Sequence, residues 1–502
     1  MTAAANLPNQ LMIAALLIPW TAALLIPLFQ KFPNIREFVT LIASGLQAFV
    51  VWSLYLMVMD EPALLKNGSL DINVLHVVPN LELAFKIEPL GLLFGLVASS
   101  LWIVNSIYSI GYMRANREPR QTLFYVCFAI AIGATIALAF SKNLFTLFLF
   151  YEALTLSTYP LVTHKGTPEA MKAGRVYLGL LIGTSMVLLL PAIIITGYFA
   201  GSLEFAQGGI LGNRLSGEGL GLLLGLFVFG IGKAALMPGH FWLPAAMVAP
   251  TPVSALLHAV AVVKAGVFTI VKVIVYVFGI KTLRESGSAD WLMWAAGFTV
   301  IAASVVALKQ DNLKKRLAYS TISQLSYVVL AAAVLTPISM MGAVIHIAGH
   351  AVSKITLFFA AGSIYTASHK TNVSELNGIG WKMPWTMGAF AVGSLAMIGL
   401  PPTAGFISKW FMLQGALESA QWLPIGVIIV STMLNAGYFL PILLRAFFCP
   451  PNRTTRDSAV DSDHGEAPWP MVLALTLTAL MALLLFFSPV VPLTLARMMI
   501  AG

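Results

Sequence analysis

Apolar runs of about 20 residues recur along the whole chain, and short polar segments separate them. A helix of this length spans a hydrocarbon core of about 30 Å. Because 59% of the 502 residues are hydrophobic and only 10% are charged, the sequence leaves no long stretch for a soluble domain. It therefore predicts an integral membrane protein.

We expect an all-α, polytopic membrane fold of about fourteen transmembrane helices. The alternative, an outer-membrane barrel, would show segments of about ten residues with alternating polarity, and the sequence has none. The expected spans are 8–30, 35–59, 89–112, 122–140, 143–163, 173–200, 219–245, 252–279, 289–308, 319–336, 338–367, 385–417, 422–447 and 468–496.

Basic residues are concentrated in alternate loops between these spans. Cytoplasmic loops are enriched in Lys and Arg, so we place this set in the cytoplasm and both termini outside a bacterial-type inner (plasma) membrane. The opposite set includes the loop 60–88, where acidic residues outnumber Lys66 and Lys86. The basic set comprises Lys31, Arg36, Arg114, Arg117, Arg120, Lys165, Lys172, Arg175, Lys309, Lys314, Lys315, Arg316, Lys370, Lys382, Arg445, Arg453 and Arg456.

Several function classes are disfavoured. Topology explains the net charge of +9, because the basic residues form no single patch for nucleic acid. Residues 1–10 carry no basic side chain and no cleavage site follows the first apolar run, so we expect the first span to be retained. Cys127 and Cys449 are the only cysteines, and no nucleotide-binding motif is present. We therefore expect no cofactor and no metal, and we assign any redox or ATP chemistry to a partner.

Ionisable residues near the middle of the expected spans are candidates for proton or ion handling, because a charge there costs from about 2.5 to more than 10 kcal/mol. For Lys142 and Lys281 we expect side chains that reach the membrane interface, and for Lys272 this and a buried role are equally open. The candidates are Glu152, Lys233, His258, Lys264, His346, His350, Lys354 and Lys409.

Glu152 lies about midway along its span. A lone carboxylate there is either protonated or paired with a cation, and we expect Lys233 to be its partner. A change in the distance between them would move the lysine between its protonated and neutral forms, which makes a switchable proton site. The alternative is a static structural ion pair.

His346, His350 and Lys354 recur at i, i+4 and i+8, which places them along one helix face at about 6 Å per step. This stripe resembles a proton wire. Zinc binding and two core histidines with purely structural roles are the alternatives. His258 and Lys264 are six residues apart, about 240° around a helix, so transfer between them needs water or another side chain.

Two spans are interrupted by proline and glycine, at 233–244 and 399–410. Transport helices often unwind at the midplane, where backbone groups line a cavity. Each break has a lysine beside it, and we expect His240 to satisfy freed backbone groups at the first. Proline kinks with packing roles are the alternative. The expected hinge residues are Pro238, Gly239, Pro401, Pro402 and Gly405.

Paired interruptions five helices apart predict two inverted five-helix repeats, each with a broken helix. We accordingly divide the chain into four parts. These are 1–120 (helices 1–3), 121–280 (first repeat, helices 4–8), 281–447 (second repeat, helices 9–13) and 448–502 (a cytoplasmic loop and helix 14).

Four stretches resemble the antiporter-like subunits shared by respiratory complex I and Mrp-type multisubunit Na+/H+ antiporters. They are KAALMPGHFWLPAAMVAPTPVSALLHAVAVVKAGVF (233–268), LKKRLAYSTISQLSYV (313–328), HIAGHAVSKITLFFAAGSI (346–364) and GLPPTAGFISKW (399–410). The resemblance extends over roughly 90–445 and keeps the order of the motifs.

The resemblance implies a role for each candidate. Glu152 and Lys233 would be the family's glutamate and lysine pair, Lys409 would be the terminal lysine, and the other five would connect them in a hydrophilic axis across the membrane. Tyr151 departs from the Trp or Phe expected there, and its hydroxyl would hydrogen-bond Glu152. Some complex I subunits carry glutamate at the position of Lys409, whereas others and the D-type Mrp subunit carry lysine, so Lys409 argues against one subfamily only. The expected absence of a long lateral C-terminal helix argues against the largest subunit of either assembly, and the D-type subunit of an Mrp antiporter is the first choice.

We therefore expect a proton-translocating subunit that works with other membrane subunits, with Na+ moving elsewhere in the complex. The alternatives are a proton-pumping subunit of an NADH:quinone oxidoreductase or membrane-bound hydrogenase, and a scaffold with an inactive channel. None of these interpretations makes the chain catalytic by itself.

Overall fold

The computed structural model describes residues 3–65, 70–78, 81–212, 214–450 and 465–501. Within these residues, eleven helices or joined helices are long and apolar enough to cross a membrane. They are α1 (Ala3–Leu25) with the short helix after it, α2 (Pro33–Asp60), α3 (Pro89–Ala115), α4 (Gln121–Ala139), α5 (Leu144–Val162), α6 (Pro168–Thr184) joined to α7 (Leu190–Ala200), the stretch Thr251–Phe278, α13 (Asp290–Lys309), α15 (Pro337–Ser368), α19 (Trp422–Phe448) and α20 (Trp469–Phe487).

The remaining three expected spans are α8 (Gly217–Gly230) with the segment after it, α14 (Leu313–Ala333), and α17 (Pro384–Ile398) with α18 (Ala404–Glu418). The all-α membrane fold is therefore confirmed. α14 begins six residues before its expected start, because Asn312 caps it by accepting a hydrogen bond from the Lys315 N–H at 3.1 Å. Lys314, Lys315 and Arg316 thus lie in the first turn of a helix rather than in a loop.

The expected last span, 468–496, is instead two helices. α20 ends at Phe487 and α21 (Val490–Ala501) begins after Pro489. Proline disfavours the α conformation in the residue before it, and Ser488 leaves helical geometry there. α21 packs against α3 and α15.

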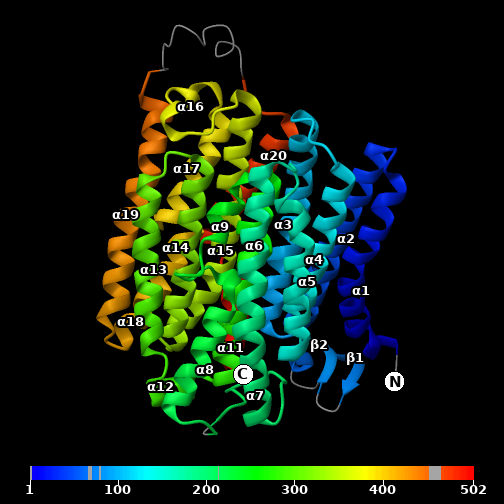
Figure 1. The fold of residues 1–502 in the computed structure, drawn as a ribbon, viewed down its shortest axis with the longest axis vertical. Helices are drawn as coiled ribbons and strands as arrows, with labels where there is room; N and C mark the ends of the chain where they lie inside the picture. Colours follow the sequence, from blue (N-terminus) through cyan, green and yellow to red (C-terminus); the bar gives the residue numbers. More distant parts are fainter. Residues whose placement is uncertain (1–2, 66–69, 79–80, 213, 451–464, 502) are drawn as a thin grey trace.

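The bundle has two distinct ends. Figure 1 shows α16 (Ile379–Lys382) and the turn between α3 and α4 at one end, here called the basic end. A β-hairpin, α12 (Ile280–Ser286) and both chain termini lie toward the other, here called the termini end. The chain termini therefore lie at the end opposite the turn between α3 and α4. Lys66, Arg453 and Arg456 lie outside the described residues.

The hairpin was not predicted. β1 (Asp71–Val78) pairs antiparallel with β2 (Leu81–Lys86) inside the expected loop 60–88. β2 is also held by backbone hydrogen bonds to the turn after α4: Lys86 N–H donates to Phe140 O at 2.7 Å, and Lys142 N–H donates to Ala84 O at 3.0 Å. The hairpin therefore covers the ends of α4 and α5 at the termini end.

Both predicted helix breaks are present. After α8 the chain forms a short 3-10 turn (η4, Gly232–Ala234), a non-helical segment and α9 (Trp242–Ala245). Residues 399–403 separate α17 from α18. Close packing at each break requires glycine: a Cβ on Gly266 would overlap the backbone of η4, and a Cβ on Gly405 would overlap the Ala396 carbonyl of α17.

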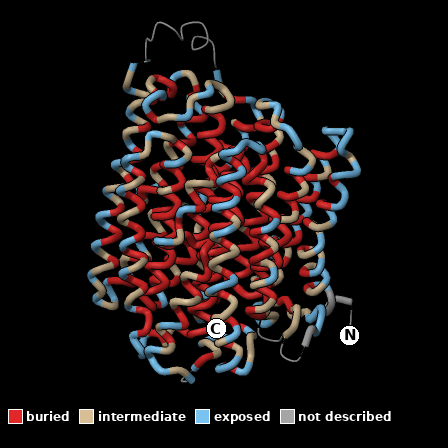
Figure 2. Tube along the Cα trace, viewed as in Figure 1, coloured by how far each residue is buried: buried red, intermediate tan, exposed pale blue. Residues whose placement is uncertain are grey.

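Burial is deepest at the centre of the bundle, as Figure 2 shows. In the most apolar 18 residues of α15, and of the stretch Thr251–Phe278, 100% of the residues are buried. In the most apolar 18 residues of the joined α6 and α7, 28% are buried. A helix that is apolar on all sides is stable at the centre of a membrane bundle. The Lys side chains and the three His side chains that are candidates on these two central helices are buried within the bundle.

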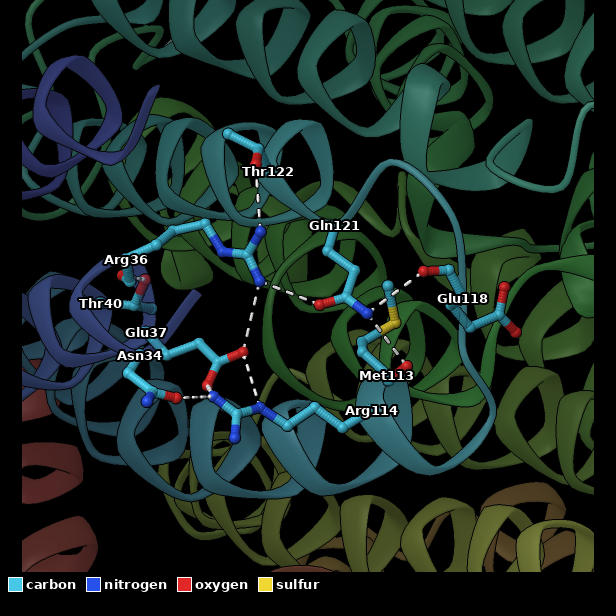
Figure 3. Close-up of polar contacts among 9 residues, drawn as sticks. All are labelled: Asn34, Arg36, Glu37, Thr40, Met113, Arg114, Glu118, Gln121 and Thr122. Atoms are coloured by element: carbon cyan, nitrogen blue, oxygen red, sulfur yellow. Dashed lines mark hydrogen bonds and ion pairs between the residues drawn. The ribbon is translucent and has the colours of Figure 1, made fainter. Parts of the chain in front are cut away.

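Arg36 and Arg114, which we expected in basic loops, lie within α2 and α3 and form an ionic cluster with Glu37 (Figure 3). Arg36 and Glu37 are buried, whereas Arg114 is exposed. Glu37 pairs with both, at 3.3 Å from Arg36 Nη2 and 3.1 Å from Arg114 Nε. Arg36 also donates to the side chains of Gln121, at 2.9 Å, and Thr122, at 3.1 Å. The cluster joins α2, α3 and α4 at the basic end.

The Glu37→Ala variant should be less stable by about 3–5 kcal/mol, because it leaves Arg36 buried without its carboxylate. Thermal unfolding of the purified protein in detergent measures this, with Glu61→Ala, which removes an exposed carboxylate, as the control. Equal stability of the two variants would contradict the structural role of the cluster.

Candidate functional site

Five of the eight candidates lie on the two central helices. α15 carries His346, His350 and Lys354. His258 lies on η6 (Leu256–Val260) and Lys264 on α11 (Val262–Val273), both within the stretch Thr251–Phe278. η6 is a π-helical turn that widens the helix between His258 and Lys264. The predicted angle of about 240°, which assumes a regular α-helix, therefore does not describe these two residues.

Lys233 lies on η4 and is fully buried. Its Nζ donates hydrogen bonds to Tyr151 O at 2.8 Å and to Thr155 Oγ1 at 2.6 Å, both on α5. The ammonium also lies 3.2 Å from the centroid of the Tyr151 ring, where the ring face favours a cation. α5 therefore provides a polar site for this lysine inside the bundle.

Glu152 and Lys233 do not form the expected direct ion pair in this structure. Both carboxylate oxygens of Glu152 are buried and have no hydrogen-bond partner among the described residues. The carboxylate is close enough to interact electrostatically with Lys233. The Tyr151 hydroxyl does not bind Glu152 as we expected, because it accepts the Lys233 backbone N–H at 3.1 Å.

Lys264 and His350 are in direct contact across the two central helices. Lys264 Nζ lies 2.6 Å from His350 Nδ1, and both residues are buried. Two like charges at this separation would repel by about 6 kcal/mol at an effective dielectric constant of 20. The pair therefore holds at most one positive charge, with one group acting as donor and the other as acceptor.

The stripe on α15 continues toward the second broken helix. The ring centroids of His350 and His346 are 5.9 Å apart. His346 Nδ1 lies 2.8 Å from Ser408 Oγ, next to Lys409 on α18. Lys264, His350, His346 and Ser408 thus form a row of polar groups from α11 to α18.

A second chain of hydrogen bonds, which the sequence analysis did not predict, links Lys354 to the Met397 carbonyl that Lys409 also binds. Lys354 Nζ donates to Ser320 Oγ at 2.9 Å, and the Tyr438 hydroxyl lies 3.1 Å from the same oxygen. Tyr438 donates to Asn435 Oδ1 at 2.5 Å, and Asn435 Nδ2 donates to Met397 O at 3.2 Å. Asn435 and Tyr438, three residues apart in the apolar α19, are the sequence signal that would have indicated this route.

Lys409 Nζ donates to Met397 O at 3.2 Å and to Ile398 O at 2.8 Å. These carbonyls end α17, and the break after them leaves them without helical partners. The negative end of the α17 dipole faces the same position. The second break therefore supplies the groups that bind the lysine.

The remaining predictions for single residues have mixed outcomes. His240 Nδ1 lies 3.3 Å from Pro238 O, as expected for a residue that satisfies the backbone at the break. His258 has no polar partner on either ring nitrogen within the described residues. The zinc alternative has little support, because Nδ1 of His346 and Nδ1 of His350 contact Ser408 and Lys264, and the described chain holds no group of three or more typical metal ligands.

Lys142, Lys272 and Lys281, for which we considered a position at the membrane interface, differ in burial. Lys281 is exposed, as expected. Lys142 is largely buried between Asp71 and Glu204, at 3.0 and 3.1 Å, at the termini end. Lys272 is fully buried and pairs with Glu88 at 3.0 Å, which favours its buried alternative.

Comparison with known proteins agrees with this geometry. Residues 141–435, more than half of the chain, match the family described as NADH:quinone oxidoreductase/Mrp antiporter, TM. The chain is 34% identical over 347 residues to NADH-quinone oxidoreductase subunit N of Desulforudis audaxviator, and the match covers 68% of each protein.

Two further comparisons cover more of the chain. It is 29% identical over 436 residues to Hydrogenase-4 component B of Escherichia coli, covering 81% of this chain and 62% of that protein. Its fold superposes on a chain of the Mrp complex from Dietzia sp. DQ12-45-1b with a TM-score of 0.84 at 18% identity, covering 100% of this chain and 97% of that one. The protein is therefore a multi-pass membrane member of the NADH:quinone oxidoreductase/Mrp antiporter family.

Proposed function

We propose that this chain is a proton-translocating subunit of a multisubunit Na+/H+ antiporter, with a role like that of the D-type subunit of Mrp antiporters. The observation that carries the proposal is the buried row of Lys and His side chains between the two broken helices. Lys264 and His350 are in hydrogen-bond contact within it, and Lys409 binds the carbonyls at the second break. No redox group or nucleotide is needed for these residues to pass a proton.

The Lys264 and His350 pair supports a transfer step. A proton on Lys264 moves to His350 along the 2.6 Å contact and leaves a neutral amine. The imidazole then releases the proton from its second nitrogen toward His346. The step conserves charge, and the return of the proton requires no new contact.

Glu152 and Lys233 fit a switch rather than a static pair. In this structure Lys233 binds Tyr151 and Thr155, while the Glu152 carboxylate has no hydrogen bond among the described residues. We propose that Lys233 alternates between these groups and Glu152, with the break after Ala234 as its hinge. Its charge would be favoured near the carboxylate and disfavoured away from it.

Water is expected at several points along the row. Both nitrogens of His258, Nε2 of His346 and Nε2 of His350 are buried and have no protein partner among the described residues. Buried polar groups are almost always hydrogen-bonded, to ordered water where protein offers nothing. Water at these atoms would link His258 and the Glu152 region to the Lys264 contact.

The proposal extends to the assembly, the membrane and the internal repeats. We propose that the chain works with other membrane subunits, lies in a bacterial-type inner membrane with its basic end in the cytoplasm, and consists of two inverted repeats over 121–280 and 281–447. We place Na+ transport elsewhere in the complex. A proton-pumping subunit of an NADH:quinone oxidoreductase is the second candidate, favoured by the 34% identity to subunit N.

Glu152→Ala and Lys233→Ala should each lower cation-dependent proton flux by about a hundredfold or more, because each removes half of the proposed switch. The measurement uses everted vesicles from an antiporter-deficient host that expresses the whole gene cluster, with assembly of the complex as the control. Wild-type flux driven by NADH, and not by Na+ or K+, would favour the second candidate. Full flux in both variants would indicate a scaffold.

His350→Gln should lower the same flux at least about tenfold, because it removes the imidazole in contact with Lys264. His240→Gln is the matched control, since His240 contacts the Pro238 carbonyl and two aromatic rings and none of the proposed proton-carrying residues. An equal effect of the two substitutions would argue against transfer through His350.

Tyr438→Phe removes the hydroxyl that joins Ser320 to Asn435 and leaves the ring in place. If the second route carries protons, flux should fall about tenfold, and the variant should keep normal assembly. Unchanged flux would leave the His346 row as the single path to Lys409.

A further inference from the structure

A second buried Glu and Lys pair lies outside the row of site residues. Glu88 Oε2 is 3.0 Å from Lys272 Nζ, and Lys272 also donates to Ser141 O at 2.8 Å. Lys272 is fully buried and Glu88 is 6% exposed. Glu88 is the N-cap residue of α3, where the positive end of the helix dipole stabilises a carboxylate.

Glu88 lines a cavity of about 480 Å³ at the termini end, and Lys272 lies behind it, paired with its carboxylate. The cavity reaches the surface at Pro62 and Gln207, which are exposed, and its inner wall includes Glu88 and Tyr276. The Tyr276 hydroxyl is buried and has no partner among the described residues. An unpartnered hydroxyl beside a carboxylate indicates that water occupies this space.

Lys272 lies on the helix that carries Lys264. The two lysines are eight residues apart on α11, which corresponds to a rise of about 12 Å. Phe268 lies midway between them, fully buried, with its ring against Phe94 at a centroid distance of 4.9 Å. Lys272 Nζ is 5.6 Å from the centroid of the Phe268 ring. Phe268 therefore lies between the two lysines along α11, with its ring near Lys272.

We propose that Glu88 and Lys272 form a proton-loading site that connects the cavity at the termini end with Lys264, and that Phe268 is its gate. This inference rests on the proposed function. Cavity water protonates the Lys272 amine beside Glu88. When Phe268 moves aside, the Lys272 ammonium passes its proton to a neutral Lys264, and the resulting amine is reloaded from the cavity.

The charged and polar groups around Lys272 fit this role. Glu88 from α3 favours the ammonium, whereas Lys86 from β2 opposes it and Tyr276 lies on the same helix. The Ser141 carbonyl and the Phe205 ring, 4.4 Å from Nζ at its centroid, complete the site. A purely structural pair would need no cavity and no link to Lys264.

The test measures cation-dependent proton flux by the assembled complex in everted vesicles. Lys272→Arg keeps the positive charge beside Glu88 but does not release a proton, because a guanidinium stays protonated. We expect Lys272→Arg and Lys272→Met both to lower flux at least tenfold with normal assembly. Lys142→Arg is the matched control, a lysine at the same end that is paired with Asp71 and Glu204 and not with Glu88.

Wild-type flux in Lys272→Arg would show that the pair is structural and would overturn the inference. A wild-type complex without flux would instead refute the proposed function itself, so the two failures are distinct. Phe268→Ala provides a test that does not depend on a loss of activity. It should produce a proton leak without added cation, and Phe268→Ala combined with Lys272→Met should abolish that leak; a leak that persists in the double variant would also overturn the inference.

Discussion

The burial of several lysines in an apolar bundle is the constraint on which the rest of this structure depends. Burying an ammonium group without a polar partner in an apolar bundle has a high free-energy cost. Here each buried lysine is bound by protein oxygens or by imidazole, and carbonyl groups are the recurrent partner. Lys233 uses the Tyr151 carbonyl of α5, Lys409 uses two carbonyls at the end of α17, and Lys272 uses the Ser141 carbonyl after α4.

This requirement gives the helix breaks a physical reason. An intact helix uses nearly all of its carbonyl groups internally. Interrupting α17 frees the carbonyls that bind Lys409, and the interruption after α8 places Lys233 on a short turn that reaches α5. The same interruptions leave local backbone with few helical hydrogen bonds, so these segments are the part of the bundle most able to rearrange. Binding of the lysine and movement of the lysine thus depend on the same structural feature.

Much of this organisation could be predicted from the sequence. Apolar runs locate the spans, because length and hydropathy are the dominant constraints on a membrane helix. Proline and glycine locate both breaks, and mid-span charges locate the buried row. The hairpin 71–86 could not be predicted in the same way, because it depends on pairing with the turn after α4. Pro489 is a sequence signal for the division of the last span, but the packing of α21 against α3 and α15 has no such signal.

The hydrogen-bond and ion-pair partners of the buried side chains were the least predictable feature of the structure. Opposite charges at the middle of two spans predict an ion pair between Glu152 and Lys233. Instead, Lys233 binds Tyr151 and Thr155, and Glu152 has no hydrogen bond among the described residues. Lys272 pairs with Glu88, which precedes it by about 180 residues, and no periodicity in the sequence relates the two. Spacing along one helix predicts neighbours on that helix, whereas contacts between helices depend on packing.

The measurement that tests the central claim most directly is proton flux through the purified, assembled complex in proteoliposomes, with wild type compared against Lys264→Met. Lys264 is the point where α11 contacts the histidines of α15, so a proton that follows the buried row must pass it. The account predicts that a cation gradient drives proton flux in wild type and that the intact variant complex has none. Equal flux in the two complexes would contradict it.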